Sequence, residues 1–177
     1  MTPWITKPVP FNIGQGAAAG AVACTPGDDL ETFSATTSYG NFSSAYLVIM
    51  RSNATQGTID DCYDQIAVDC DSSNGNIRMG AYSDTSDEPD VLYAQTASIP
   101  VTADYAFKSI DEFTLTSVST WFALQPDEDN SVMEGGEASG DDRWHKSFTY
   151  GSFPDPAGSG YIEVTEAQLR KMKIGHT

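Results

Sequence analysis

The segment at residues 143 to 153, RWHKSFTYGSF, places aromatic, cationic and imidazole side chains together. Trp144 and Tyr150 carry flat rings that can stack on the apolar C–H faces of sugars, with nearby carboxylates or amides to hold the hydroxyls. His145 is a general base in principle, but no serine or cysteine stands in a recognisable nucleophile motif. We therefore expect no enzyme. Packing in a core is the simpler interpretation of these aromatic rings, and glycan contact by Trp144 and Tyr150 is the alternative.

Carboxylates are the second group that could bind a ligand, because calcium prefers oxygen ligands. Residues 56–76 contain five aspartates, and residues 126–143 contain seven carboxylates with one cation at the end. The first stretch lacks the glycine and the distal glutamate of an EF-hand loop, so a solvated loop with an Asn74-Gly75 turn is favoured. The second predicts a loop whose charge repulsion is screened by cations. Calcium is the one cofactor we keep as an alternative.

The three cysteines are Cys24, Cys62 and Cys70, an odd number that does not suggest a disulfide framework. Cys62 and Cys70 flank a short run and could be cross-linked in an oxidising medium if their geometry allowed it. At least one thiol remains unpaired in a monomer. The sequence leaves the pairing of Cys62 with Cys70 open.

Composition limits the class of protein. The chain has 177 residues, enough for one domain with its own core, and 25 acidic against 9 basic residues give a net charge of −16. Such a charge repels nucleic acid and anionic membranes, so neither is an expected partner. No signal-peptide h-region and no apolar run of membrane-spanning length is evident. We expect a protein made in the cytoplasm.

The N-terminal 29 residues predict an extended arm and a linker of small residues. Three prolines fall within the first eleven residues, which disfavours a central strand or a helix. The arm's apolar side chains need a surface to cover, either on the same domain or on a neighbouring subunit. The candidate partner-binding residues of the arm are Trp4, Ile5, Val9 and Phe11.

Residues 162–177 predict a tail with a short cationic helix. Thr165 is a suitable N-cap, and Gly175 a suitable stop. Arg170, Lys171 and Lys173 would lie in the last turn, where the helix dipole favours positive charge. These three cations, together with the N-terminal arm, resemble attachment elements. The alternative is that both ends fold back on their own domain.

Residues 30–161 predict strands at short intervals with no convincing helix. The apolar run at residues 43–52 fits a strand buried on both faces, at the centre of a sheet. Residues 76–92 read as a strand, a polar turn over residues 83–89 and a second strand. Residues 119–125 predict a further strand. The fold class that follows is all-β, a single antiparallel β-sandwich.

These strands also carry a resemblance. NIRMGAYSD, a turn with Pro89, VLYAQTASIPV, then FTL and TWFALQ resemble a jelly-roll β-sandwich family found in phage structural proteins and in cell-surface or carbohydrate-binding modules. The match covers about residues 43 to 126. Gly80 and Ala81 depart from it, since bulkier residues usually stand there. The matching positions belong to core and turns, so the resemblance implies a fold more than a function.

Two functions follow as expectations. The first is a non-enzymatic structural protein of a virion, such as a capsid decoration or another head or tail accessory subunit, anchored by its termini. Its partners would be other virion proteins, such as the major capsid protein, and further copies of itself. The second is a module that recognises carbohydrate on a host surface, with calcium as a potential aid. We favour the first, because it gives both termini a role.

Overall fold

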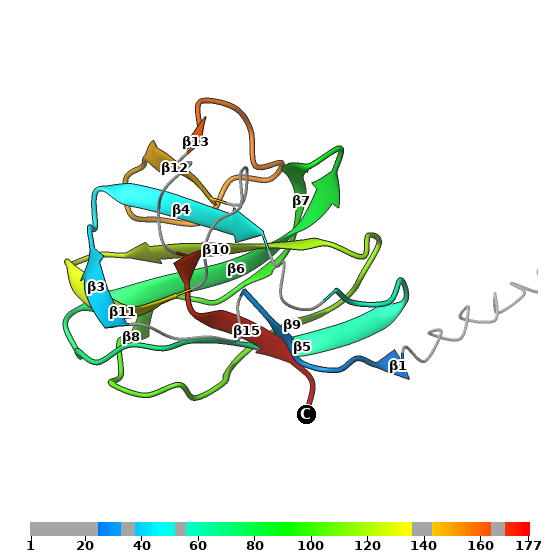
Figure 1. Cartoon of the computed structure of the whole chain (residues 1–177), viewed down its shortest axis with the longest axis horizontal. Helices are drawn as coiled ribbons and strands as arrows, with labels where there is room; N and C mark the ends of the chain where they lie inside the picture. The colour runs from blue at the N-terminus through cyan, green and yellow to red at the C-terminus, as the bar shows by residue number, and fades with distance from the viewer. Residues whose placement is uncertain (1–24, 33–37, 52–55, 136–142, 164–168) are drawn as a thin grey trace, which may run out of the picture.

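The computed structural model describes residues 25–32, 38–51, 56–135, 143–163 and 169–177, and every regular element in these ranges is a β-strand (Figure 1). The predicted all-β class is confirmed. No helix among these residues is long and apolar enough to cross a membrane. The strands are β1 (Thr25–Pro26), β2 (Leu30–Glu31), β3 (Ser38–Phe42), β4 (Tyr46–Arg51), β5 (Asp61–Val68), β6 (Asn76–Thr85), β7 (Glu88–Gln95), β8 (Ile99–Pro100), β9 (Lys108–Thr114), β10 (Thr120–Pro126), β11 (Asn130–Gly135), β12 (Arg143–Ser147), β13 (Ile162–Glu163), β14 (Leu169–Arg170) and β15 (Met172–Gly175).

The strands form three sheets. The largest has seven strands in the order β13-β12-β4-β10-β6-β7, with β8 paired to β6. The second has five strands in the order β1-β5-β15-β2, with β9 paired to β5. A small sheet of three strands has the order β14-β11-β3, and its strands β3 and β11 lie on the left of Figure 1. The described pairings are antiparallel except that of β1 with β5.

Strand β4 is buried on both faces, as its apolar run predicted. It lies between β10 and β12 in the seven-stranded sheet. Val48 and Met50 belong to a large core cluster that contains residues of all three sheets. Leu47 and Ile49 belong to a smaller cluster on the opposite face, covered by the loop that contains Phe153. The prediction of a central strand is therefore confirmed.

The predicted hairpin is also present, as β6 and β7. Its turn is shorter than predicted, because Ser86 and Asp87 alone connect the strands. Both have positive φ, 58° and 64°, which is the backbone of a type I′ turn. The twist of such a turn matches that of the flanking strands. Because the turn needs only two residues, the polar residues Ser83 and Asp84 belong to β6.

Strand β5 is longer than its polar sequence indicated. Residues 56–76 predict a polar excursion in which only residues 65–68 are strand-like, yet β5 occupies Asp61–Val68 and pairs with β1, β9 and β15. Tyr63 and Ile66 are fully buried in the large cluster. Burial does not alternate strictly along β5, whose register with β9 shifts between Tyr63 and Gln65. Five residues of the strand are buried, whereas Asp61 and Asp64 remain partly exposed.

The predicted C-terminal helix is wrong for residues 169–175, which form β14 and β15. Met172 and Ile174 are completely buried, and Lys173 between them lies on the other face. This period of two, together with pairing to β5 and β2, outweighs the favourable helix signals. Residues 165–168 lie outside the described part, as does the N-terminal arm with its residues Trp4, Ile5, Val9 and Phe11.

Candidate functional site

Strand β12 separates two pockets, because its side chains alternate between the faces of the seven-stranded sheet. In register with β4, Trp144 lies opposite Ile49, and His145 lies opposite Val48. Ile49 belongs to the smaller core cluster, and Val48 to the larger one. Trp144 therefore lines a pocket on the side of the smaller cluster, and His145 lines one on the side of the larger.

The pocket beside Trp144, which we call the aromatic pocket, has a volume of about 300 Å³. Trp144 and Tyr161 form its aromatic part, with ring centres 6.2 Å apart and planes tilted by 40°. Both rings are only partly buried. The rest of the lining comes from β7 and the loop before β13: Glu88, Gly158, Ser159 and Gly160.

Trp144 is held in place from behind by Trp121. The two ring centres are 5.1 Å apart, and Trp121 is fully buried. The indole N–H of Trp121 donates a hydrogen bond of 2.9 Å to Oδ2 of Asp84, which also pairs with Arg51 at 3.7 Å. A ring fixed in this way presents a rigid platform, which lowers the entropic cost of binding.

Tyr161 is fixed by two contacts to its own loop and to β12. Its hydroxyl donates to the carbonyl of Ala157 at 3.1 Å, and Nζ of Lys146 donates to the same carbonyl at 3.0 Å. The ammonium group lies 4.1 Å from the centre of the Tyr161 ring, a favourable cation–π contact. Burial lowers the pKa of Lys146 and raises that of Tyr161, so at neutral pH the tyrosine is uncharged.

The loop of residues 148–161 is tied to the hairpin beneath it. Tyr82 donates to the carbonyl of Pro154 at 2.7 Å, and the amide of Ala157 donates to the carbonyl of Asp90 at 2.8 Å. Gly158 and Gly160 adopt positive φ of 77° and 86°, a region that other residues rarely enter. These glycines bring the backbone round to the rim of the aromatic pocket.

Chemically, the aromatic pocket offers two ring faces, one carboxylate and a loop rich in backbone donors and acceptors. Sugars present an apolar face for stacking and hydroxyls for hydrogen bonding, so this combination suits a saccharide unit. Its volume is at the lower end of the range for ligand sites. Glu88 is exposed, so its carboxylate can accept hydrogen bonds from hydroxyl groups at the rim.

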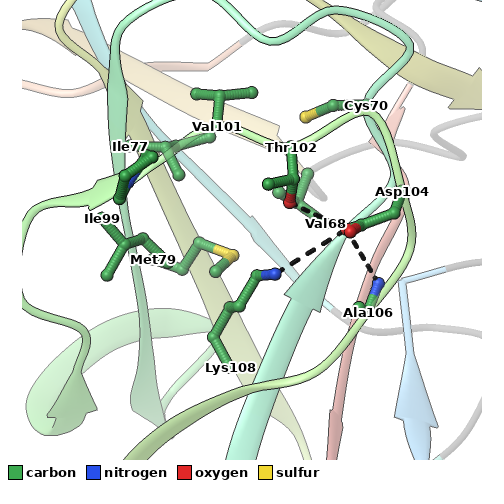
Figure 2. A pocket seen from close by; sticks show the side chains of 11 residues that line it. Val68, Cys70, Ile77, Met79, Ile99, Val101, Thr102, Asp104, Ala106 and Lys108 are labelled. Carbon is green, nitrogen blue, oxygen red and sulfur yellow. Dashed lines mark hydrogen bonds and ion pairs between the residues drawn. The ribbon is translucent and has the colours of Figure 1, made fainter.

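A second cavity lies at one end of the large cluster, close to Cys70 (Figure 2). Asp104 organises its polar side, accepting hydrogen bonds from Thr102 at 2.9 Å and from the amide of Ala106 at 3.2 Å, with Lys108 at 3.8 Å. Its volume of about 10 Å³ is that of a single water. This cavity is too small for a ligand.

The structure separates the two residues predicted for glycan contact. Trp144 lies in the aromatic pocket, but β12 ends at Ser147, and Tyr150 lies elsewhere. The Tyr150 hydroxyl is 2.8 Å from that of Ser98, and the guanidinium of Arg78 lies 5.8 Å from its ring centre. Tyr161 is the aromatic partner of Trp144. Tyr161 carries no local sequence signal of this pairing, because a loop of more than ten residues separates it from Trp144 in the chain.

The predicted cationic attachment residues lie on the body of the fold. Arg170 is buried and forms an ion pair with Glu134. Nζ of Lys171 lies 5.4 Å from the ring centre of Tyr105, and that of Lys173 lies 4.3 Å from the same ring. Arg170 is therefore too buried to attach the chain to another protein, whereas the two lysines remain partly exposed.

Several of the described carboxylates considered for calcium accept hydrogen bonds from the chain itself. Among the described residues, no group of three or more His, Cys, Asp or Glu side chains is arranged to hold a metal ion. Asp64 accepts from the hydroxyl and the amide of Thr177, and Asp69 accepts from the hydroxyl of Tyr39. Asp127 accepts from the amide and the side chain of Asn76.

The structure shows whether Cys70 pairs with Cys62, a question that the sequence left open. The Cys70 thiol is free and buried, so it makes no bridge to Cys62.

Comparison of the chain with models of protein families, with curated proteins and with solved structures finds no match.

Proposed function

We propose that the chain is a non-enzymatic structural protein of a virion, a β-sandwich of jelly-roll type that serves as a capsid decoration or another head or tail accessory subunit. Its partners are the major capsid protein or other virion proteins, and further copies of itself. The observation that carries this proposal is that the polar side chains of the described loops fasten the chain to itself. A rigid body of this kind suits a structural subunit.

The carboxylates with shifted pKa illustrate this use. Hydrogen bonds from neighbouring groups lower the pKa of four aspartates that are fully or partly exposed: Asp64, Asp104, Asp127 and Asp129. A carboxyl group that acts as a general acid near neutral pH needs a raised pKa. The opposite direction here supports a structural role for these carboxylates. Asp129, for example, accepts from the amide and hydroxyl of Ser44 across 85 residues of sequence.

The attachment part of the proposal rests on the N-terminal arm, because β15 and Arg170 belong to the body of the fold. To test it, the chain is expressed together with the genes that lie beside its own, and particles are separated by sedimentation. We expect the chain to co-sediment with particles and a variant lacking residues 1–11 to stay in the soluble fraction. Particles that form normally while the full chain remains soluble would contradict the proposal.

A second candidate function, recognition of host-surface carbohydrate, is favoured by the aromatic pocket. A glycan array with the purified chain tests it, with and without a chelator to detect any need for calcium. Glu88→Gln and Trp144→Ala should each weaken a saccharide hit about tenfold or more. Tyr150→Ala is the matched control, since Tyr150 lies outside the pocket. Absence of any hit, or equal loss in the control, would remove this function.

A further inference from the structure

The pocket on the other side of β12, which we call the cationic pocket, has a volume of about 260 Å³. Its lining residues come from β3, the turn after β3, β4, β12 and β14, and β3, β4 and β12 lie on the left of Figure 1. Its lining residues are Asn41, Phe42, Ser43, Tyr46, Val48, Arg143, His145 and Arg170. The pocket therefore combines two guanidinium groups, an imidazole, an amide and two hydroxyls.

Its charge is opposite to that of the molecule. The chain has 25 acidic and 9 basic residues, yet two arginines and one of the two histidines line this pocket, and no carboxylate is among the lining residues that the structure describes. A recess lined by one sign of charge concentrates ions of the other sign. Here that ion is an anion.

Arg170 is already oriented. It is 5% exposed, its Nη2 donates to the carbonyl of Asn41 at 2.8 Å, and its guanidinium also pairs with Glu134. Its Nε is buried and makes no hydrogen bond within the described part of the chain. Burial lowers the pKa of Arg170 to about 10, so the side chain is still cationic at neutral pH.

Arg143 and His145 stand on the same face of β12. Burial lowers the pKa of Arg143, which remains charged because an arginine starts so high. Burial, and then the positive charge of Arg143, lower the pKa of His145. The imidazole lies edge-on to Tyr46, with ring centres 5.1 Å apart. Because the charge of Arg143 lowers the pKa of His145, an anion bound beside Arg143 would raise that pKa.

We propose that the cationic pocket binds an oxyanion, a carboxylate or a sulfate carried by a small ligand. The planar guanidinium group matches the paired oxygens of such a group, and partial burial strengthens the attraction. A monoanion fits best, because Glu134 already neutralises part of the charge and the molecule as a whole repels polyanions. The site lies on the opposite side of β12 from the aromatic pocket and is independent of both proposed functions.

Titration calorimetry and NMR of the His145 ring test the proposal on the full chain at constant ionic strength. Sodium glucuronate and sodium methyl sulfate are the monoanionic probes, and glucose is the neutral probe, similar in size to glucuronate. We expect saturable binding of glucuronate, methyl sulfate or both, a raised pKa of His145 in the complex, and no response to glucose. Binding of glucuronate alone would identify a sugar carboxylate, and binding of both a general oxyanion site.

Arg143→Gln should weaken binding about tenfold or more, since it removes a charge-assisted contact. Arg78→Gln is the matched control, because that arginine lies beside Tyr150. Thermal unfolding of each variant shows that the fold is kept, and Tyr46→Phe provides a second, milder change in the pocket. The proposal is overturned by an equal response to glucose, by the absence of saturation, or by unchanged binding in Arg143→Gln.

Discussion

The ring of Phe153 lies directly over the Cα of Gly80. A Cβ at residue 80 would come within 2.9 Å of that ring and within 3.0 Å of the carbonyl of Ala94. This explains why a small residue stands where the strand pattern suggests a bulkier one. The loop of residues 148–161 can settle on the sheet only because β6 leaves room for Phe153.

Gly80→Val should therefore destabilise the protein, although valine is the better strand former. We expect a loss of about 1–3 kcal/mol in the free energy of unfolding, because the ring or the backbone must move. Urea denaturation followed by tryptophan fluorescence measures it. Gly151→Ala is the control, since the nearest atom to its new Cβ lies 3.7 Å away. Equal stability of the two variants would contradict the explanation.

Asp84 holds two partners at the rim of the smaller cluster, the indole of Trp121 and the guanidinium of Arg51. Asp84→Ala leaves a buried N–H without an acceptor, so the free energy of unfolding should fall by about 1–3 kcal/mol. Asp87→Asn is the matched variant, because Asp87 also contacts Arg51 but its side chain is largely exposed. It should cost less than about 1 kcal/mol. The reverse ranking would exclude the assigned role of Asp84.

Substitutions in residues 172–175 distinguish a strand from a helix at the C-terminal end, because Ile174 is buried in β15 and Lys173 lies on its other face. Ile174→Ala should cost about 2–5 kcal/mol, as for other completely buried side chains. Lys173→Ala, on the other face of β15, should have a small effect. Thermal unfolding of both variants is the measurement. If neither substitution changes the unfolding temperature, residues 172–175 are not part of the core.

Stability should fall in acid. Hydrogen bonds lower the pKa of Asp64, Asp104, Asp127 and Asp129 below the ordinary value of 3.8. A carboxyl group with a lowered pKa in the folded state stabilises it fully above the ordinary value, and this contribution disappears as the pH falls through the folded pKa. Denaturant midpoints between neutral pH and about pH 3 should therefore decrease, and less steeply in Asp127→Asn. A denaturant midpoint that stays constant between neutral pH and about pH 3 would contradict this prediction.

Cys70 should be unreactive in the folded protein. Burial, followed by the charges of Asp69, Asp71 and Asp104, raises the pKa of its thiol to about 12, so the reactive thiolate is almost absent at neutral pH. Iodoacetamide labelling followed by mass spectrometry of the Cys70 peptide checks this. We expect labelling only after unfolding in denaturant. Rapid labelling of the native chain would show that the thiol is accessible.

Periodicity in the sequence was sufficient for the elements with a clear pattern. The apolar run of β4 predicted a strand buried on both faces, and residues 119–125 predicted the strand β10. In β10, Phe122 and Leu124 lie in the large core cluster, and Trp121 and Ala123 lie in the smaller one, as expected for side chains that alternate along a strand. The turn at residues 86 and 87 was placed too broadly, since polar residues also occur inside an antiparallel strand. β5 was underestimated for the same reason.

The candidate site could be predicted only in part. Trp144 was identified from its residue type and its neighbours, but its partner Tyr161 and the carboxylate of Glu88 come from a loop and another strand. No pattern within a single stretch of the sequence indicates that Trp144, Tyr161 and Glu88 lie close together. The helix predicted at the C-terminal end is wrong because capping and dipole interactions stabilise a helix by only about 1 kcal/mol each. Pairing β15 with two strands and burying Met172 and Ile174 stabilises the strand by more.

The insertion of β15 between β5 and β2 has a consequence for biosynthesis. The five-stranded sheet joins residues near 30, near 65 and near 174, so it stays incomplete until the last of these has left the ribosome. Contacts so distant in sequence form slowly, and the earlier strands meanwhile expose unpaired edges. We therefore expect nascent chains that stop before residue 172 to need chaperones, and the whole body to acquire its structure in one late step.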